Sequence, residues 1–149
     1  KGETRYMNYE SLSDGGFASG SMMGSGGFIV LDEDQCIVRN TYSLARFYRH
    51  ESCGQCSPCR EGTGWMEKLL YRLEKGEGKS SDIDLLWDIQ SKIEGNTICP
   101  LGDAAAWPVA AAIRHFRDEF EWHVTHAAEA QTSNFGLAHY ADPIHVPTV

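Results

Sequence analysis

Three of the chain's five cysteines lie in one short segment, HESCGQCSPCREGTGW, which covers residues 50–65. They are Cys53, Cys56 and Cys59, in the spacing C-x2-C-x2-C, and Cys99 stands much later in the chain. Four thiolates can ligate the four iron corners of a [4Fe–4S] cluster. Three ligands in one loop can cover one side of the cluster, and a distant cysteine can reach the remaining corner. The spacing therefore favours an iron–sulfur site.

Other roles for these cysteines stay open at this point. Structural zinc also accepts four thiolates, although its ligands usually come as two separated C-x2-C pairs. A redox dithiol needs one C-x-x-C and leaves Cys59 without a role. A disulfide would leave two of these four thiols unpaired, and the total number of cysteines is odd, which argues against a disulfide framework. We therefore expect the protein in a reducing compartment. Coincidental core cysteines are the last alternative.

The residues around the cysteine loop suit a negatively charged group. Gly54 would leave backbone N–H groups open toward sulfur, and a helix that starts at Pro58 would point its positive end at the site. Arg60 is expected either to add a positive charge or to pair with a neighbouring glutamate. For His50 we expect packing or a hydrogen bond near the loop.

For the remaining cysteine and for two neighbouring histidines, the sequence favours a structural role over metal binding or catalysis. Cys36, in DEDQCIV, is expected to be a small buried residue at a strand edge. His123 and His126 have helical i, i+3 spacing, but no cysteine or carboxylate pattern completes a metal site, so we expect exposed helix-end histidines. No Ser/His/Asp or Cys/His catalytic set has supporting spacing. The four tryptophans are expected to fill the core or an interface.

Composition limits the class of protein. The 149 residues carry a net charge of −8, which argues against nucleic-acid binding, with 42% hydrophobic and 23% charged residues, typical of a globular domain. No apolar run approaches the roughly 20 residues of a membrane-spanning helix. The first residues, KGETRYMNYE, include no initiator Met or targeting pattern, so we expect the sequence to begin within a domain.

The region before residue 36 is rich in glycine. The segment GGFASGSMMGSGG precedes an apolar run, residues 28–31, that predicts a short buried strand. Phosphate-binding loops follow a strand and open a helix, whereas these glycines come before the strand. We therefore interpret them as a structural turn at the end of a small α+β domain.

The rest of the sequence predicts a four-helix bundle. The expected N-caps are Asn40, Ser57, Ser81 and Asp103. Gly95 should end the third helix, and Pro108 should kink the fourth, which continues to about residue 126. The inner faces are expected to consist of Leu44, Phe47 and Tyr48; Trp65, Met66, Leu69, Leu70 and Leu73; Leu86, Ile89 and Ile93; and Ile113, Phe116, Phe120 and Val124.

Two long blocks resemble a known family. RFYRHESCGQCSPCREGTGWM and the later IEGNTICPLGDAAAWPVAAAIRHFR closely resemble the C-terminal part of the NADH-binding flavoprotein subunit of respiratory complex I, NADH:quinone oxidoreductase. GSGGFIVLDED resembles the end of the family's ubiquitin-like domain. The resemblance implies three regions: 1–38, the C-terminal portion of that α+β domain; 39–127, a mainly α four-helix iron–sulfur domain; and 128–149, an extended C-terminal arm.

The resemblance also implies a role in electron transfer. The cluster ligands would be Cys53, Cys56, Cys59 and Cys99, and the cluster would accept electrons singly from FMN that NADH has reduced. Leu101 and Gly102 would line the side facing the flavin, unless they are only loop structure. The FMN- and NADH-binding domain lies upstream and is absent here, so this chain alone should not oxidise NADH.

Partners and location follow from the same resemblance. We expect other subunits of a complex I-type assembly, notably iron–sulfur subunits, and a peripheral position on the cytoplasmic side of the bacterial inner membrane or the mitochondrial matrix side. The diaphorase subunit of an NAD-linked hydrogenase or formate dehydrogenase shares these blocks and is one alternative. A zinc-stabilised interaction module without redox activity is another.

Overall fold

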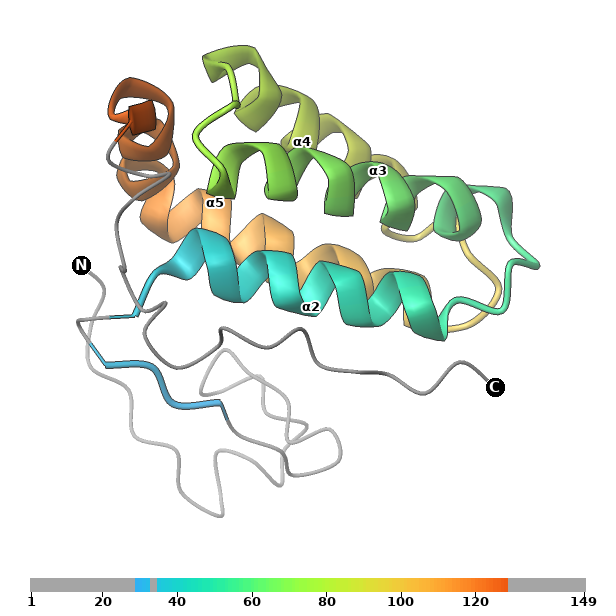
Figure 1. The fold of residues 1–149 in the computed structure, drawn as a ribbon. Coiled ribbons are helices and arrows are strands. Elements are labelled where there is room, and N and C mark those ends of the chain that lie inside the picture. The colour runs from blue at the N-terminus through green and yellow to red at the C-terminus, as the bar shows by residue number, and fades with distance from the viewer. Residues whose placement is uncertain (1–28, 33–34, 129–149) are drawn as a thin grey trace. The chain divides into compact units, whose positions relative to one another are not determined.

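The computed structural model describes residues 29–32 and 35–128, and the chain divides into two compact units, Lys1–Asp32 and Glu33–Val149. The described part of the second unit contains four helices: α2 (Ile37–Glu51), α3 (Ser57–Glu74), α4 (Ser80–Ile93) and α5 (Leu101–Thr125). The mainly α class and the four-helix bundle are therefore confirmed (Figure 1).

The strand predicted for residues 28–31 is absent from its described part. Ile29 and Val30 have irregular backbone and are 70% and 90% exposed. A strand needs a neighbour to satisfy its N–H and C=O groups, and the described ranges contain no second strand. Residue 28, the glycine-rich segment and the C-terminal arm lie outside the described residues, so the regions expected at 1–38 and 128–149 stay predictions.

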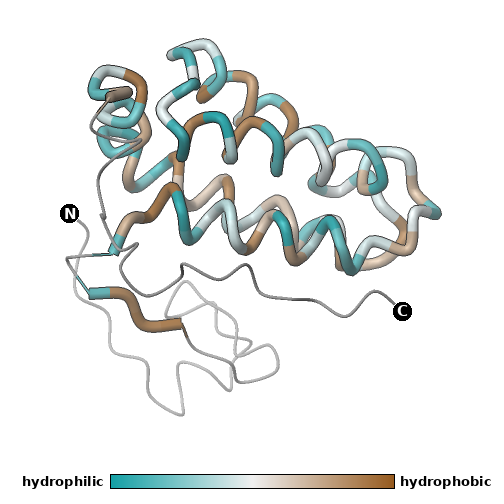
Figure 2. The backbone as a smooth tube through the Cα atoms, viewed as in Figure 1, coloured by the Kyte–Doolittle hydropathy of each residue, from teal (hydrophilic) through white to brown (hydrophobic). Residues whose placement is uncertain are grey.

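The bundle buries one continuous core between its helices. α2 packs against α3 and α5, and α4 packs against the same two helices. Hydrophobic residues recur along each helix (Figure 2), and burial of these faces drives the assembly of the bundle. The largest fully buried side chains are Phe120, Met66, Leu70, Leu73, Ile83, Leu86, Ile93, Gln90, Val38, Val109 and Thr63.

The predicted inner faces are correct in the interior of α3 and α4, but the face predicted for α2 is wrong, since none of Leu44, Phe47 and Tyr48 is buried. The aliphatic positions expected inside α3 and α4 are all buried. Trp65 and Phe47, however, are about half exposed, at 54% and 55%. In α2 the buried face is formed by Val38, Thr41 and Ala45 instead, because the helix packs on two neighbours through smaller residues.

Helix α5 bends at Phe116 and not at Pro108. The backbone angles of Phe116 (φ −133°, ψ 29°) are non-helical, and Figure 1 shows the last part of α5 turning away from its first part. Proline's fixed φ is itself helical, and the helix continues through Pro108. The break turns Phe116 outward, so this residue is 47% exposed and not part of the core as predicted.

Each helix begins earlier in the sequence than predicted. The observed N-caps are Cys36, Cys56, Lys79 and Pro100. Asp103 lies inside the first turn of α5, where it accepts a hydrogen bond from the Gly95 N–H at 2.7 Å. Gly95 follows α4 with a φ of +72°, so the predicted end of that helix is confirmed.

None of the helices in the described part of the chain combines the length and the apolar character that crossing a membrane requires.

Candidate metal centre

The two cysteine-bearing connections lie at the same end of the bundle. Residues 52–56 join α2 to α3, residues 94–100 join α4 to α5, and Figure 1 shows both loops beside each other. The backbone N–H of Ile98 donates to Sγ of Cys56 at 3.4 Å. The structure thus brings the segment next to Cys99 onto the loop of Cys53 and Cys56, across 42 residues of sequence.

A positive φ and two side chains shape the cysteine loop. Gly54 has a φ of +78°, a conformation in which a side chain is strained. Its carbonyl accepts a hydrogen bond from Nη1 of Arg60 at 3.0 Å, while Nε of Arg60 contacts Glu61 at 2.9 Å. Oγ of Ser52 lies 3.1 Å from Sγ of Cys59. The predicted ion pair of Arg60 with a glutamate is therefore confirmed, and its charge toward a bound cluster stays a prediction.

Two helices begin directly beside these cysteines. α3 starts after Cys56 and α5 after Pro100, and neither first turn has a side-chain cap. The first N–H groups of a helix have no partner within it and carry the positive end of the helix dipole. Uncapped N-termini at this end of the bundle therefore suit a negatively charged bound group.

The four thiols differ in their exposure to solvent. Cys59 is buried at 7%, Cys56 is intermediate, and Cys53 and Cys99 are exposed. All four, and Cys36, are free cysteines. Ile98 is 87% exposed beside them. The site is thus anchored on the core through Cys59 and open on the side of Cys53 and Cys99.

The placement of the sulfurs does not match a single zinc ion. Zn–S bonds of about 2.3 Å in a tetrahedron place the sulfurs roughly 3.8 Å apart. Within residues 35–128, no three of the four sulfurs lie within 4.8 Å of one another. A cubane of four irons holds its ligand sulfurs farther apart than one ion does. Four thiol donors that do not form a compact tetrahedron fit the four corners of a [4Fe–4S] cluster better than one zinc ion.

The other residues predicted near the site have simpler surroundings. His50 is exposed and its Nδ1 lies 2.9 Å from Oε1 of Glu51. Leu101 and Gly102 belong to the first turn of α5 and not to a loop. Gly102 is buried, and a Cβ there would overlap the Thr97 side chain. Close packing thus explains this glycine, and its place beside a flavin stays a prediction.

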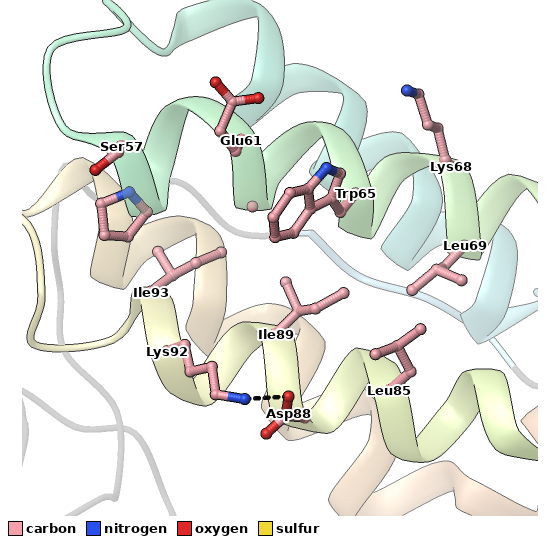
Figure 3. A pocket seen from close by; sticks show the side chains of 12 residues that line it. Ser57, Glu61, Trp65, Lys68, Leu69, Leu85, Asp88, Ile89, Lys92 and Ile93 are labelled. Atoms are coloured by element: carbon pink, nitrogen blue, oxygen red, sulfur yellow. Dashed lines mark hydrogen bonds and ion pairs between the residues drawn. The ribbon is translucent and has the colours of Figure 1, made fainter.

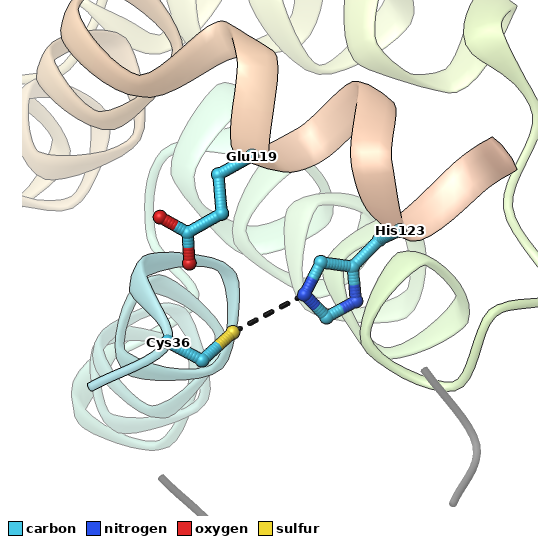
Figure 4. A group of neighbouring side chains, drawn as sticks. All are labelled: Cys36, Glu119 and His123. Atoms are coloured by element: carbon cyan, nitrogen blue, oxygen red, sulfur yellow. Dashed lines mark hydrogen bonds between the residues drawn. The ribbon is translucent and has the colours of Figure 1, made fainter. Parts of the chain in front are cut away.

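A second group of ligand-type side chains was missed by sequence reasoning. Sγ of Cys36 lies 3.2 Å from Nε2 of His123, and Oε1 of Glu119 accepts a hydrogen bond from the Ile37 N–H at 2.7 Å (Figure 4). Cys36 and His123 are both 4% exposed. Cys36 is buried as predicted, but it caps a helix and does not edge a strand. His123 is buried, contrary to prediction, whereas His126 is exposed.

Burial dominates the protonation of this second group. It raises the pKa of the Cys36 thiol to about 11, with a further contribution from the Glu119 charge. It lowers the pKa of His123, against the opposing effect of Glu119. Both side chains are therefore neutral near pH 7. No local signal predicts this contact, since the two residues are separated by 87 positions.

An apolar groove of about 660 Å³ runs between α3 and α4 (Figure 3). Trp65, Leu69, Leu85 and Ile89 line it, and Asp88 and Lys92 form an ion pair at its rim. The groove lacks a set of converging polar groups, so it carries no evident chemistry.

Comparison with known proteins agrees with this geometry. Residues 39–123 match the family model described as the NADH-ubiquinone oxidoreductase-F iron-sulfur binding region. The chain is 53% identical to the F subunit of NADH-quinone oxidoreductase from Rickettsia bellii over 119 residues, which cover 80% of this chain and 28% of the relative. It is 48% identical to the Rickettsia typhi protein of the same name over 132 residues, or 89% of this chain and 28% of the relative.

A solved structure has the same arrangement of helices. The crystal structure of an NAD+-reducing [NiFe]-hydrogenase in the H2-reduced state matches with a TM-score of 0.61 and 33% identity, over 64% of this chain and 16% of that chain. The chain thus spans little more than a quarter of the length of the curated relatives that it matches.

Proposed function

Since the chain belongs to the NADH-ubiquinone oxidoreductase-F iron–sulfur binding region family, we propose that it holds a [4Fe–4S] cluster through Cys53, Cys56, Cys59 and Cys99. The observation that carries this proposal is the contact of the Ile98 N–H with Sγ of Cys56, because it joins the two cysteine loops at one place. The bound cluster would accept and release single electrons.

The residues of the chain would tune and position this group. Hydrogen bonds to cluster sulfurs raise the reduction potential, and the Ile98 N–H and the Ser52 hydroxyl lie within reach of the Cys56 and Cys59 sulfurs. The uncapped starts of α3 and α5 add favourable potential for negative charge. Burial of Cys59 excludes water from one side of the site, which favours electron transfer over loss of iron.

The larger assembly is part of the same proposal. We infer that electrons come from FMN reduced by NADH, both bound upstream in the whole subunit, and continue to further iron–sulfur subunits of a complex I-type assembly. Residues 1–149 alone should not oxidise NADH. The assembly would be peripheral, on the cytoplasmic side of a bacterial inner membrane or the matrix side of a mitochondrial one. The net charge of −8 would assist docking to basic partner surfaces.

A second candidate is the diaphorase part of an NAD-linked hydrogenase or formate dehydrogenase. The likeness to the NAD+-reducing hydrogenase favours it. The cluster, FMN and NAD(H) would be the same in both candidates, although electrons would run toward NAD+ in an NAD+-reducing hydrogenase. The proteins that copurify with the native chain would separate the two.

Substitution of Cys99 tests the ligand set directly. The Cys99→Ser chain, reconstituted anaerobically, should lose at least about one of four irons or the whole cluster. Cys36→Ser is the matched control and should keep its full iron content, because Cys36 lies at the other end of α2. Unchanged iron in Cys99→Ser, or iron loss in Cys36→Ser alone, would contradict the assignment.

A further inference from the structure

A second metal-binding site is formed where the start of α2 meets the end of α5. We propose that Cys36, Glu119 and His123 bind one Zn²⁺ ion there, independently of the cysteine loops. Their ligand atoms all lie within 4.8 Å of one another. A helix of 15 residues, α2, separates this group from the loop of Cys53, which is about 20 Å at 1.5 Å per residue.

The three side chains point toward one another from two helices. Figure 4 shows the Cys36 sulfur facing Nε2 of His123, with the Glu119 carboxylate on the same side. The distance from sulfur to Nε2 is 3.2 Å. One Glu119 oxygen accepts the Ile37 N–H, and a carboxylate has a second oxygen with free lone pairs. The site therefore offers one sulfur, one nitrogen and one oxygen.

The surroundings of His123 keep its ring in the form that binds metals. The ring is almost fully buried, and backbone groups of Leu73 and Glu74 in α3 act on it. Because burial keeps the ring neutral, Nε2 can offer a lone pair to a metal while Nδ1 carries the proton.

The charges of the site match a divalent ion. Without metal, the thiol is protonated, since its pKa is raised by burial. Binding converts the thiol and Zn²⁺ to a zinc thiolate and releases one proton to solvent. The thiolate and the Glu119 carboxylate then carry two negative charges against two positive ones, and the imidazole is neutral. A net charge of zero is the least costly state for a site that is mostly buried.

The ligand types select zinc among common metals. Thiolate, imidazole and carboxylate are the three donors that zinc uses in proteins, and sites with three protein ligands complete the tetrahedron with water. Calcium and magnesium prefer oxygen donors only. Glu119 is the half-exposed member of the group, so a water can enter on its side. Zinc would thereby link the N-terminus of α2 to the C-terminal part of α5.

The alternative is a metal-free contact, in which Glu119 caps α2 and the thiol bonds to the imidazole. Both arrangements hold the helices together, but only one binds zinc. The test uses the full chain with its iron–sulfur cluster loaded anaerobically, mixed with about two equivalents of Zn²⁺ and freed of excess metal. Zinc and iron are then measured together in the parent, Cys36→Ala, His123→Gln and the control His126→Gln.

We expect about one zinc per chain in the parent and in His126→Gln, and less than about a tenth of that in the other two variants, with equal iron in all four. Absence of zinc from the parent, or zinc retained in both Cys36→Ala and His123→Gln, would overturn the site. Because iron is counted separately, failure here leaves the proposed cluster intact.

Cobalt provides a measurement that does not depend on the variants folding. Co²⁺ in place of zinc should give the parent a thiolate-to-cobalt charge-transfer band while its iron content is unchanged. No such band, or a band that appears only as iron is lost, would also overturn the proposal.

Discussion

Replacement of Gly62 by alanine tests whether α3 and α4 pack as closely as the structure has them beside the cysteine loops. Gly62 is buried in α3, and a Cβ there would lie 2.7 Å from Cδ1 and 2.8 Å from Cγ1 of Ile93 in α4. Ile93 is itself only 1% exposed and cannot swing into solvent. The new methyl group therefore requires the Ile93 side chain or the two helices to shift within a packed core.

Gly64, two positions later in the same helix, is the matched control. A Cβ at Gly64 would meet only the Arg49 side chain, at an ordinary contact distance of 3.6 Å. Glycine to alanine inside a helix gains about 1 kcal/mol of stability, and overpacking a core costs about 1–3 kcal/mol. Gly64→Ala should thus gain about 1 kcal/mol, whereas Gly62→Ala should be neutral or lose up to about 2 kcal/mol.

The assay is thermal unfolding of the cluster-loaded chains under identical conditions, followed by the helical circular dichroism signal. A difference of about 1–3 kcal/mol corresponds to a midpoint lower by at least about 4 °C for Gly62→Ala than for Gly64→Ala. Ile93→Val removes Cδ1, so it should cost less stability in the Gly62→Ala background than alone. Equal midpoints for the two glycine variants, or an equal cost of Ile93→Val in both backgrounds, would refute the close packing.

Three further perturbations test other parts of the structure. Phe120→Ala should lose about 3–5 kcal/mol of stability in denaturant unfolding, because the ring is fully buried. Phe116→Ala should change the stability by less than about 1 kcal/mol, because the break in α5 leaves this ring exposed, and equal losses for the two variants would contradict a break at Phe116. Gly54→Ala should cost about 1–2 kcal/mol through its positive φ and speed iron loss to a chelator, and an unchanged rate would contradict the loop geometry. In the chain freed of zinc, the pKa of Cys36 is raised from 9.0 to about 11, so the unfolded thiol ionises first and stability should fall as pH rises through this range; a Cys36→Ala chain with the same pH dependence would exclude this thiol as the cause.

The bundle could be predicted because its signals are local. Met66, Leu70 and Leu73 repeat at helical spacing and are buried as expected. The burial of residues at the edge of such a stripe cannot be predicted from spacing, because it depends on how the neighbouring helices cross. Trp65 is adjacent to Met66, yet it is more than half exposed and lines the groove between α3 and α4.

Helix starts were less predictable, for a physical reason. The N-cap residue depends on which backbone N–H groups lack a partner in the folded chain. Several polar side chains near the start of a helix can compete for these N–H groups. Asp103 has the right type for an N-cap, but its carboxylate binds the Gly95 N–H across the loop. Asp82 accepts the Lys79 N–H at 2.8 Å in the same way, so that α4 starts before the predicted Ser81.

The two candidate metal sites differ in whether the spacing of their ligands along the sequence reveals them. Cys53, Cys56 and Cys59 lie within seven residues at the start of α3, and their spacing alone predicts the site. Cys36 and His123 meet only because α2 and α5 pack against each other, and their separation of 87 positions leaves no pattern in the sequence. Long-range contacts of this kind require the fold before they can be recognised.

The central claim is that four cysteines hold a redox-active [4Fe–4S] cluster, namely Cys53, Cys56, Cys59 and Cys99. Analysis of iron and acid-labile sulfide, together with low-temperature EPR, tests this claim most directly. The full chain, prepared anaerobically, should contain about four irons and four sulfides and should give an EPR signal only after reduction with dithionite. A chain with zinc as the only metal on these four cysteines, and with no EPR signal after reduction, would contradict it.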